Sequence, residues 1–199
     1  MVRTAVLVSG GGTNLQAILD AKAAGKIPSA EIALVVASNS RAYALTRAEN
    51  AGVPGVVVHK EKDEDIVRYG ERLLEVLHAH GIGLVVLAGF LTILPENVIR
   101  AYDHRILNIH PSLIPSFCGK GFYGLKVHEA ALQNGVKVTG ATVHFVNEIP
   151  DGGEIIAQKA VEVLPGDTPE ILQRRVMEQA EWLLLPRALE DVARALNEA

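Results

Sequence analysis

A chain of 199 residues, 49% of them hydrophobic, is long enough for one domain with a substantial core. No apolar run reaches the length of a membrane span, and the beginning of the chain lacks the long apolar stretch of a signal peptide. The net charge of −4 argues against a broad nucleic-acid-binding surface, and the single cysteine, Cys118, excludes an internal disulfide and suits the cytoplasm. No histidines have the spacing of metal ligands, so no metal site is predicted.

Strands and helices alternate along the first half of the chain. Short apolar runs predict strands over residues 2–8, 32–37, 56–58, 84–88 and the segment that ends at Asn108. Helices are expected between them, over about 13–25, 41–51, 63–80 and 95–102. This succession predicts a single doubly wound, mostly parallel, Rossmann-like α/β sheet.

The second half has a different pattern. A loop over 116–124, rich in glycine and aromatic residues, precedes a helix over about 125–134. Strands over 140–146 and 154–161 are joined by a short turn, which predicts antiparallel pairing. The last segment, about 168–197, reads as one long helix that Pro186 could kink.

Asn108 and His110 lie at the end of a predicted strand, just before Pro111. Side chains alternate along a strand, so these two point the same way. An amide donor and a proton-carrying imidazole therefore meet at a strand's carboxyl end, where open α/β sheets place their chemistry. A turn-capping Asn and a structural His remain the alternative.

The turn Ser9-Gly10-Gly11-Gly12-Thr13-Asn14 joins the first strand to the first helix. It lacks the third glycine of a dinucleotide fingerprint and the lysine of a Walker A loop. Glycines and a helix N-terminus can still hold one phosphate through backbone N–H groups, with Thr13 and Asn14 as further partners. An ordinary tight turn is the alternative.

A catalytic histidine commonly has a carboxylate partner, and the segment 147–153 offers Glu148 and Asp151. Asp151 precedes two glycines, which leave room for a neighbouring side chain. It could equally be a turn-forming Asp that bonds to its own backbone.

These motifs, together with Leu87-Ala88-Gly89-Phe90, Asn108-Ile109-His110-Pro111-Ser112-Leu113 and His144-Phe145-Val146, occur in an order that closely resembles one family. It is the family of folate-dependent phosphoribosylglycinamide formyltransferases, and the resemblance covers nearly the whole chain. The resemblance implies one formyltransferase domain over 1–199, with a phosphoribosyl-substrate half at about 1–105 and a catalytic and folate half at about 106–199.

The resemblance also implies roles for individual residues. Asn108, His110 and Asp151 would be catalytic, with His144 supporting them. The 5-phosphoribosylglycinamide would be held by Gly12, Thr13, Asn14 and Glu181. The co-substrate 10-formyltetrahydrofolate would lie against Leu91, Thr92, Ile93, Leu94, Asn108, Asn147, Glu148, Ile149, Pro150 and Asp151.

The chain departs from the family pattern at three places. The loop over 116–124 is longer and more glycine-rich than the common form, so its contacts cannot be transferred. The position of an arginine near the folate tail falls on Ile66, which leaves Arg68 as a substitute. A glutamine expected near the substrate falls on Met177, and Glu181 matches the family's glutamate only after a one-residue shift.

The implied reaction is formyl transfer in purine biosynthesis. The substrate amine attacks the formyl carbon, Asn108 and protonated His110 stabilise the oxyanion, and Asp151 favours the charged histidine. Ser112 and Cys118 are not nucleophiles in this scheme. The alternatives are a formyltetrahydrofolate hydrolase and a non-catalytic nucleotide-binding module. The expected partners are two small-molecule substrates, with no nucleic acid and no membrane, and a homodimer is left open.

Overall fold

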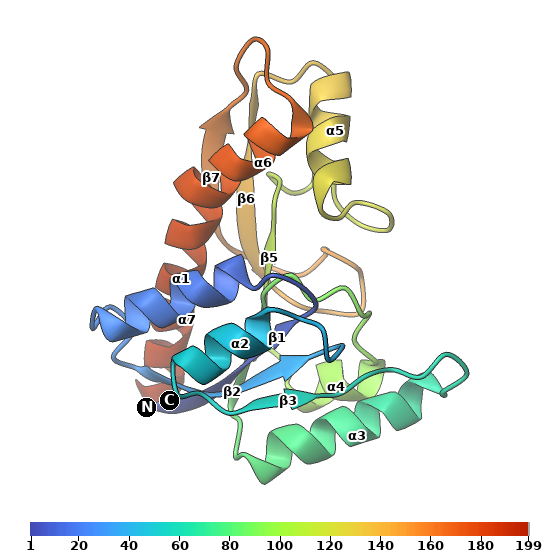
Figure 1. Cartoon of the computed structure of the whole chain (residues 1–199), viewed down its shortest axis with the longest axis vertical. Helices are drawn as coiled ribbons and strands as arrows, with labels where there is room; N and C mark the ends of the chain where they lie inside the picture. The colour runs from blue at the N-terminus through green and yellow to red at the C-terminus, as the bar shows by residue number, and fades with distance from the viewer. Residues whose placement is uncertain (199) are drawn as a thin grey trace.

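Seven strands form one sheet in the order β3-β2-β1-β4-β5-β6-β7 in the computed structural model, which describes residues 1–198 (Figure 1). The first five strands run parallel, and β6 and β7 are antiparallel to their neighbours. The predicted fold class is therefore confirmed. The strands are β1 (Val2–Val8), β2 (Ala30–Ala37), β3 (Gly55–Val57), β4 (Leu84–Leu87), β5 (Ile106–His110), β6 (Val138–Phe145) and β7 (Ile155–Glu162).

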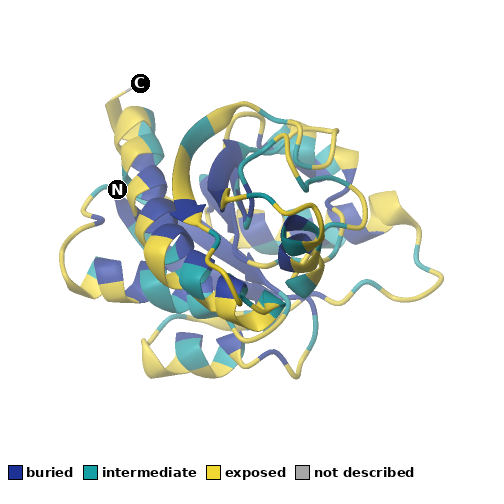
Figure 2. Ribbon diagram, turned by 90° about the horizontal axis from the view of Figure 1, so that it is seen from above, coloured by how far each residue is buried: buried dark blue, intermediate teal, exposed yellow. Residues whose placement is uncertain are grey.

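Helices cover both faces of the parallel part of the sheet, and the alternation along β1 shows why. Val6 and Val8 belong to the core under α1, α2 and the C-terminal helix α7 (Trp182–Glu198), whereas Ala5 and Leu7 belong to the core under α3 and α4. Figure 2 shows the central strands buried, with the exposed residues on the outer sides of the helices. The helices before the C-terminal segment are α1 (Thr13–Ala23), α2 (Ala44–Asn50), α3 (Ile66–Ala79), α4 (Glu96–Ala101) and α5 (Leu125–Gln133).

The C-terminal segment is not the single helix that the sequence predicted. It consists of α6 (Pro169–Val176), a π-helical turn (Met177–Glu181) and α7 (Trp182–Glu198). A π turn holds one more residue than an α turn and so rotates every side chain that follows it. The helix is irregular at residues 177–181 and continues through Pro186, which lies in the second turn of α7. Glu181, at the end of the π turn, is buried beside α1.

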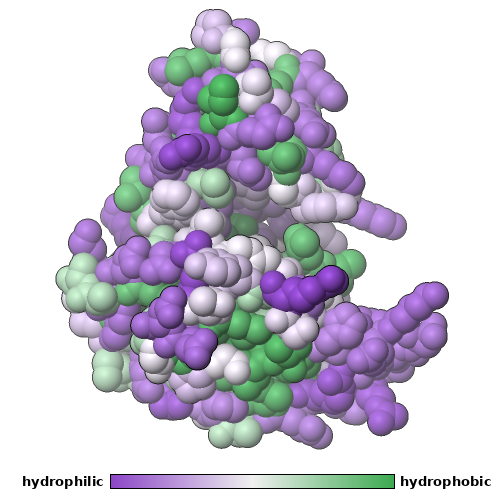
Figure 3. Space-filling view, in the orientation of Figure 1, coloured by the Kyte–Doolittle hydropathy of each residue, from purple (hydrophilic) through white to green (hydrophobic). Residues whose placement is uncertain are grey.

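The topology creates a crevice where β1 lies between β2 and β4. Connections leave β1 and β4 toward opposite sides of the sheet, and such switch points are where open α/β sheets bind ligands. Figure 3 shows the surface hollowed between the part formed by the first strands and the part formed by α5, α6, β6 and β7. None of the helices within residues 1–198 combines the length and the apolar character that crossing a membrane requires.

Candidate active site

Asn108 and His110 lie two residues apart at the C-terminal end of β5, which extends two residues beyond its predicted end. In the antiparallel pairing with β6, Asn108 lies directly opposite His144. Directly opposed residues of an antiparallel pair project from the same face of the sheet. Strand register alone therefore brings these polar side chains together.

Asp151 reaches the same place from the connection between β6 and β7. Its backbone is left-handed, with a φ of 56°, a conformation that Asp and Asn tolerate better than most residues. A Cβ atom on Gly153 would run into the Phe145 carbonyl, and one on Gly152 would lie 2.6 Å from the Ile149 side chain. The two glycines are thus required for the close reversal that presents Asp151.

The carboxylate of Asp151 lies between two imidazoles. Its oxygens are 3.6 Å from Nδ1 of His110 and 3.6 Å from Nε2 of His144, and Nδ2 of Asn108 donates to it at 3.4 Å. Burial alone would raise the pKa of Asp151, but the interaction with His144, the charge of His110 and the Gly119 N–H together lower it. The Asp151 side chain, which is only 14% exposed, therefore carries a negative charge within the site.

The loop over 116–124 contacts the side chains of His110 and Asp151 through its backbone atoms. The N–H of Gly119 donates to Oδ2 of Asp151 at 2.8 Å, and Nε2 of His110 lies 2.9 Å from the Phe117 carbonyl oxygen. Because a carbonyl oxygen only accepts, Nε2 carries a proton in this contact, while Nδ1 faces the Asp151 carboxylate at 3.6 Å, beyond hydrogen-bond distance. The sequence carried no signal for these contacts, because they are made by backbone atoms.

His144 contacts Asn108 directly. Its Nδ1 lies 2.8 Å from the Phe145 carbonyl oxygen, and its Nε2 lies 3.1 Å from Nδ2 of Asn108. Because a carbonyl oxygen only accepts, Nδ1 carries a proton in the first contact. His144 and Asp151 thus both lie beside the Asn108 amide nitrogen.

A cavity of about 180 Å³ opens beside this cluster. Three apolar side chains at its rim, Leu91, Ile93 and Ile149, are 64 to 75% exposed. All of the residues that the family resemblance implies for folate line it: Leu91, Thr92, Ile93, Leu94, Asn108, Asn147, Glu148, Ile149, Pro150 and Asp151.

The glycine turn after β1 borders the same crevice. The N–H of Ser9 donates to the Gly89 carbonyl, and the Ser9 hydroxyl accepts from the N–H of Leu91. Gly12 has a φ of 72°, and a Cβ atom there would lie 2.7 Å from that of Ala44. Glycine is therefore required at this position by both conformation and space.

The side chains after the turn point toward the π-helical turn. Nδ2 of Asn14 donates to Oε2 of buried Glu181 at 2.5 Å, and the Thr13 hydroxyl lies 3.9 Å from the sulfur of Met177. Burial raises the pKa of Glu181, and the Asn14 hydrogen bond opposes this. One N–H of the Asn14 amide is thus bonded to Glu181, and its second N–H, the Thr13 hydroxyl and the backbone N–H groups are the donors that the turn can offer to a ligand.

No candidate metal site is found among the described residues. Within residues 1–198, no group of three or more His, Cys, Asp or Glu side chains is arranged to hold a metal ion.

Comparison with known proteins identifies the family. A formyl transferase family model matches residues 2–189. The chain belongs to the formyl transferase family. It is 39% identical to a phosphoribosylglycinamide formyltransferase of Haemophilus influenzae over 94% of this chain and 84% of that protein.

The family resemblance extends to the solved fold. Glycinamide ribonucleotide transformylase 1 from Symbiobacterium toebii superposes with a TM-score of 0.91 at 43% identity, covering 98% of this chain and 89% of that one. A chloroplastic phosphoribosylglycinamide formyltransferase of Arabidopsis thaliana is 42% identical over 91% of this chain. The chain spans 62% of the length of that plant relative.

Proposed function

We propose that this protein transfers the formyl group of 10-formyltetrahydrofolate to the amine of 5-phosphoribosylglycinamide. The observation that carries the proposal is the meeting of Asn108, His110 and Asp151 in one crevice. That crevice is flanked by the cavity at residues 91–94 and 147–151 on one side and by the glycine turn on the other. Substrates held on these two sides would meet at the triad.

The two halves of the site suit the two substrates. The cavity combines an apolar rim with the polar groups of Asn108 and Asp151, as a flat heterocycle with polar edges requires. The turn at Gly12 and Thr13 offers backbone N–H groups and the N-terminus of α1 to a phosphate. Glu181, buried beside Asn14, faces the same region and would bind the ribose.

The chemistry follows from the charges of the site. The substrate amine attacks the formyl carbon, and negative charge develops on the formyl oxygen. The Asn108 amide and the His110 imidazolium stabilise that charge, which is commonly the largest catalytic contribution in acyl transfer. His110, or a water that it orients, then gives a proton to N10, and the bond between the formyl carbon and N10 breaks so that the folate leaves as a neutral amine. The proton that the attacking amine loses returns to the imidazole.

Asp151 stabilises the imidazolium of His110 before the proton is transferred. Its lowered pKa keeps the carboxylate ionised, and the ion pair across 3.6 Å favours the imidazolium. Cys118 takes no part as a nucleophile. Burial raises the pKa of its thiol, and the nearby charge of Asp151 raises it further.

We further propose that the chain acts as one formyltransferase domain in the cytoplasm. Residues of about 1–105 hold the phosphoribosyl substrate, and residues of about 106–199 supply the catalytic groups and much of the folate site. The partners are two small molecules, and the reaction needs no metal.

Absorbance measurements with 10-formyltetrahydrofolate test the proposal. Turnover that requires added glycinamide ribonucleotide is the expected result. Turnover without the acceptor would instead indicate a formyltetrahydrofolate hydrolase, and no turnover in either mixture would indicate a non-catalytic binding module.

A further inference from the structure

Three carbonyl groups of the glycine turn accept hydrogen bonds from the segment 39–47. The Ser9 carbonyl accepts from Nδ2 of Asn39 at 2.9 Å, and the Gly10 carbonyl accepts from the N–H of Ala44 at 3.2 Å. The Gly11 carbonyl accepts from Nε of Arg47 at 2.7 Å. In a planar trans peptide the N–H points opposite to the C=O. The N–H groups of residues 10, 11 and 12 are therefore turned away from Asn39 and α2.

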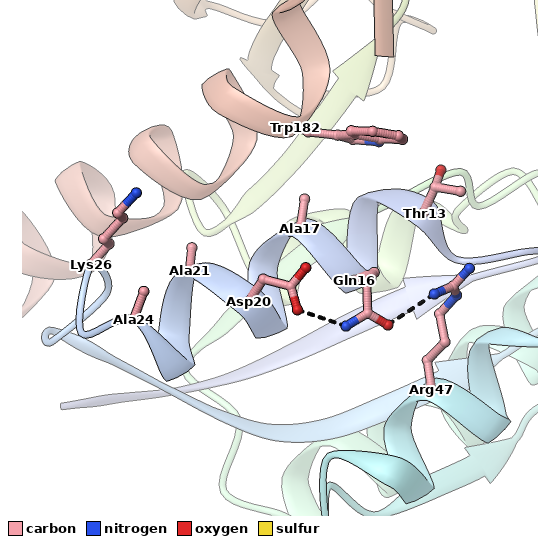
Figure 4. A pocket seen from close by; sticks show the side chains of 9 residues that line it. All are labelled: Thr13, Gln16, Ala17, Asp20, Ala21, Ala24, Lys26, Arg47 and Trp182. Atoms are coloured by element: carbon pink, nitrogen blue, oxygen red, sulfur yellow. Dashed lines mark hydrogen bonds between the residues drawn. The ribbon is translucent and has the colours of Figure 1, made fainter. Parts of the chain in front are cut away.

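Arg47 is held in place by more than this one bond. Its Nη1 donates to Oε1 of Gln16 at 2.9 Å, and Nε2 of Gln16 in turn donates to Oδ1 of Asp20 at 2.8 Å (Figure 4). The guanidinium carbon also lies 5.1 Å from the centre of the Tyr43 ring. Gly11, Gln16 and Tyr43 thus fix the guanidinium against the turn.

The charge of Arg47 is available to a ligand. No carboxylate within residues 1–198 lies within ion-pair distance of it, and Asp20 is connected to it only through the neutral Gln16 amide. Arg47 and Thr13 line one end of a cavity of about 480 Å³, and Trp182 overhangs that end (Figure 4). The first turn of α1 contributes no acidic side chain that would oppose the guanidinium.

We infer that Arg47 positions the phosphate-binding turn and supplies its positive charge. Its Nε bond orients the Gly11–Gly12 peptide so that the N–H faces the anion. Its guanidinium adds a full charge to the partial charge at the N-terminus of α1, which by itself amounts to about half a unit. This role rests on the proposed binding of the substrate phosphate at the turn, and it makes Arg47 a determinant of selectivity for phosphorylated acceptors.

The two functions of Arg47 are separable by substitution. Arg47→Lys keeps the charge, but an ammonium lacks the planar fork that reaches Gly11 and Gln16 together. Arg47→Met removes both functions and keeps an apolar stem of similar length. Lys26→Met is the matched control, because Lys26 is an exposed cation that lines the far end of the same cavity.

Steady-state kinetics of the full chain would test the inference. For Arg47→Met we expect the KM for glycinamide ribonucleotide to rise about 10-fold or more, as for the loss of a charge-assisted phosphate contact. For Arg47→Lys we expect a smaller rise. The kcat and the KM for the folate should change less than about 2-fold in both variants and in Lys26→Met.

A second measurement separates phosphate binding from general damage. Inhibition of the wild-type protein by inorganic phosphate should weaken in parallel with the KM change in Arg47→Met. The kcat/KM for the dephosphorylated glycinamide riboside should stay the same in both proteins.

The outcomes distinguish this inference from the proposed function. Wild-type KM values in Arg47→Met, with phosphate still inhibiting, would refute the role of Arg47 and leave the turn as the phosphate site. An equal loss with the riboside would show a merely structural role. A wild-type protein that phosphate does not inhibit and that does not use the ribonucleotide would refute the proposed function itself.

Discussion

Replacing Asp151 by Asn should lower kcat at least ~100-fold while leaving the fold intact. Asn has the same shape and is equally suited to the left-handed backbone at this position, where φ is 56°. What the substitution removes is the negative charge that lies 3.6 Å from His110. The proposed oxyanion site would then lose the carboxylate whose charge attracts the imidazolium of His110.

The magnitude follows from the distance. Two unit charges 3.6 Å apart attract one another by about 5 kcal/mol at an effective dielectric constant of ~20. A 100-fold loss of rate corresponds to about 2.7 kcal/mol, so the prediction needs only about half of that attraction. Removing general acid–base assistance has an effect of the same order, about 100-fold to 10,000-fold.

The assay is the initial rate of folate absorbance change at pH 7.5 with both substrates saturating, together with thermal unfolding of each variant. Glu154→Gln serves as the control, because it removes an exposed carboxylate three residues away. The control should keep nearly the full rate. Near-normal turnover by Asp151→Asn would contradict the electrostatic role and make Asp151 a turn residue.

Four further predictions concern other parts of the molecule. Inorganic phosphate should compete with the ribonucleotide but not with the folate, because the proposed anion site lies at the turn after β1; competition with both substrates would argue against it. Direct transfer predicts that double-reciprocal plots intersect and that Cys118→Ser keeps most of its activity. Parallel lines would instead indicate a covalent formyl-enzyme intermediate. Glu181→Gln should raise the KM for the ribonucleotide more than that for the folate, and equal effects would assign Glu181 to packing. His128 is fully buried, and burial, with a smaller contribution from charged His110, lowers its pKa to about 4. Its unfolded form binds a proton below about pH 6.5, so this group should lower the free energy of unfolding by about 3 kcal/mol as the pH falls from 7 to 4; urea unfolding of His128→Gln should show a weaker fall, and an unchanged pH dependence would refute this.

The parallel half of the fold was predictable because its strands are buried on both sides. Continuous apolar runs such as 84–88 are typical of strands that helices cover on both faces, and glycines mark the turn after the first strand. The proximity of Asn108 and His110 followed from the two-residue period of a strand. These features depend on neighbours in the sequence, which is why sequence patterns reveal them.

Features that depend on distant segments were not predictable in the same way. Asp151 lies 41 residues beyond His110, and only the register of β6 against β5 brings its turn back to that side chain. From the residues alone Asp151 remained open as a turn residue, and the family resemblance was needed to select it. The contacts of the loop over 116–124 are made by backbone groups of Phe117 and Gly119, which leave no mark in the sequence.

The π-helical turn shows how a local irregularity can defeat a periodic pattern. Apolar spacing across 168–197 fits one helix, and the extra residue held by Met177–Glu181 is invisible to a fixed period. The one-residue shift needed to match Glu181 with the family was its only trace. The Asn14–Glu181 contact pairs side chains 167 residues apart, so no local sequence pattern could reveal it.

A single-turnover experiment with formyl-labelled 10-formyltetrahydrofolate tests the central claim most directly. Enzyme in excess is mixed with the labelled folate, glycinamide ribonucleotide is added to one of two samples, and both samples are then quenched. The position of the label is determined by mass spectrometry. Direct transfer predicts that the label stays on the folate until the acceptor is added and then appears only on the acceptor amine. Labelled protein or labelled formate in the absence of the acceptor would contradict the account.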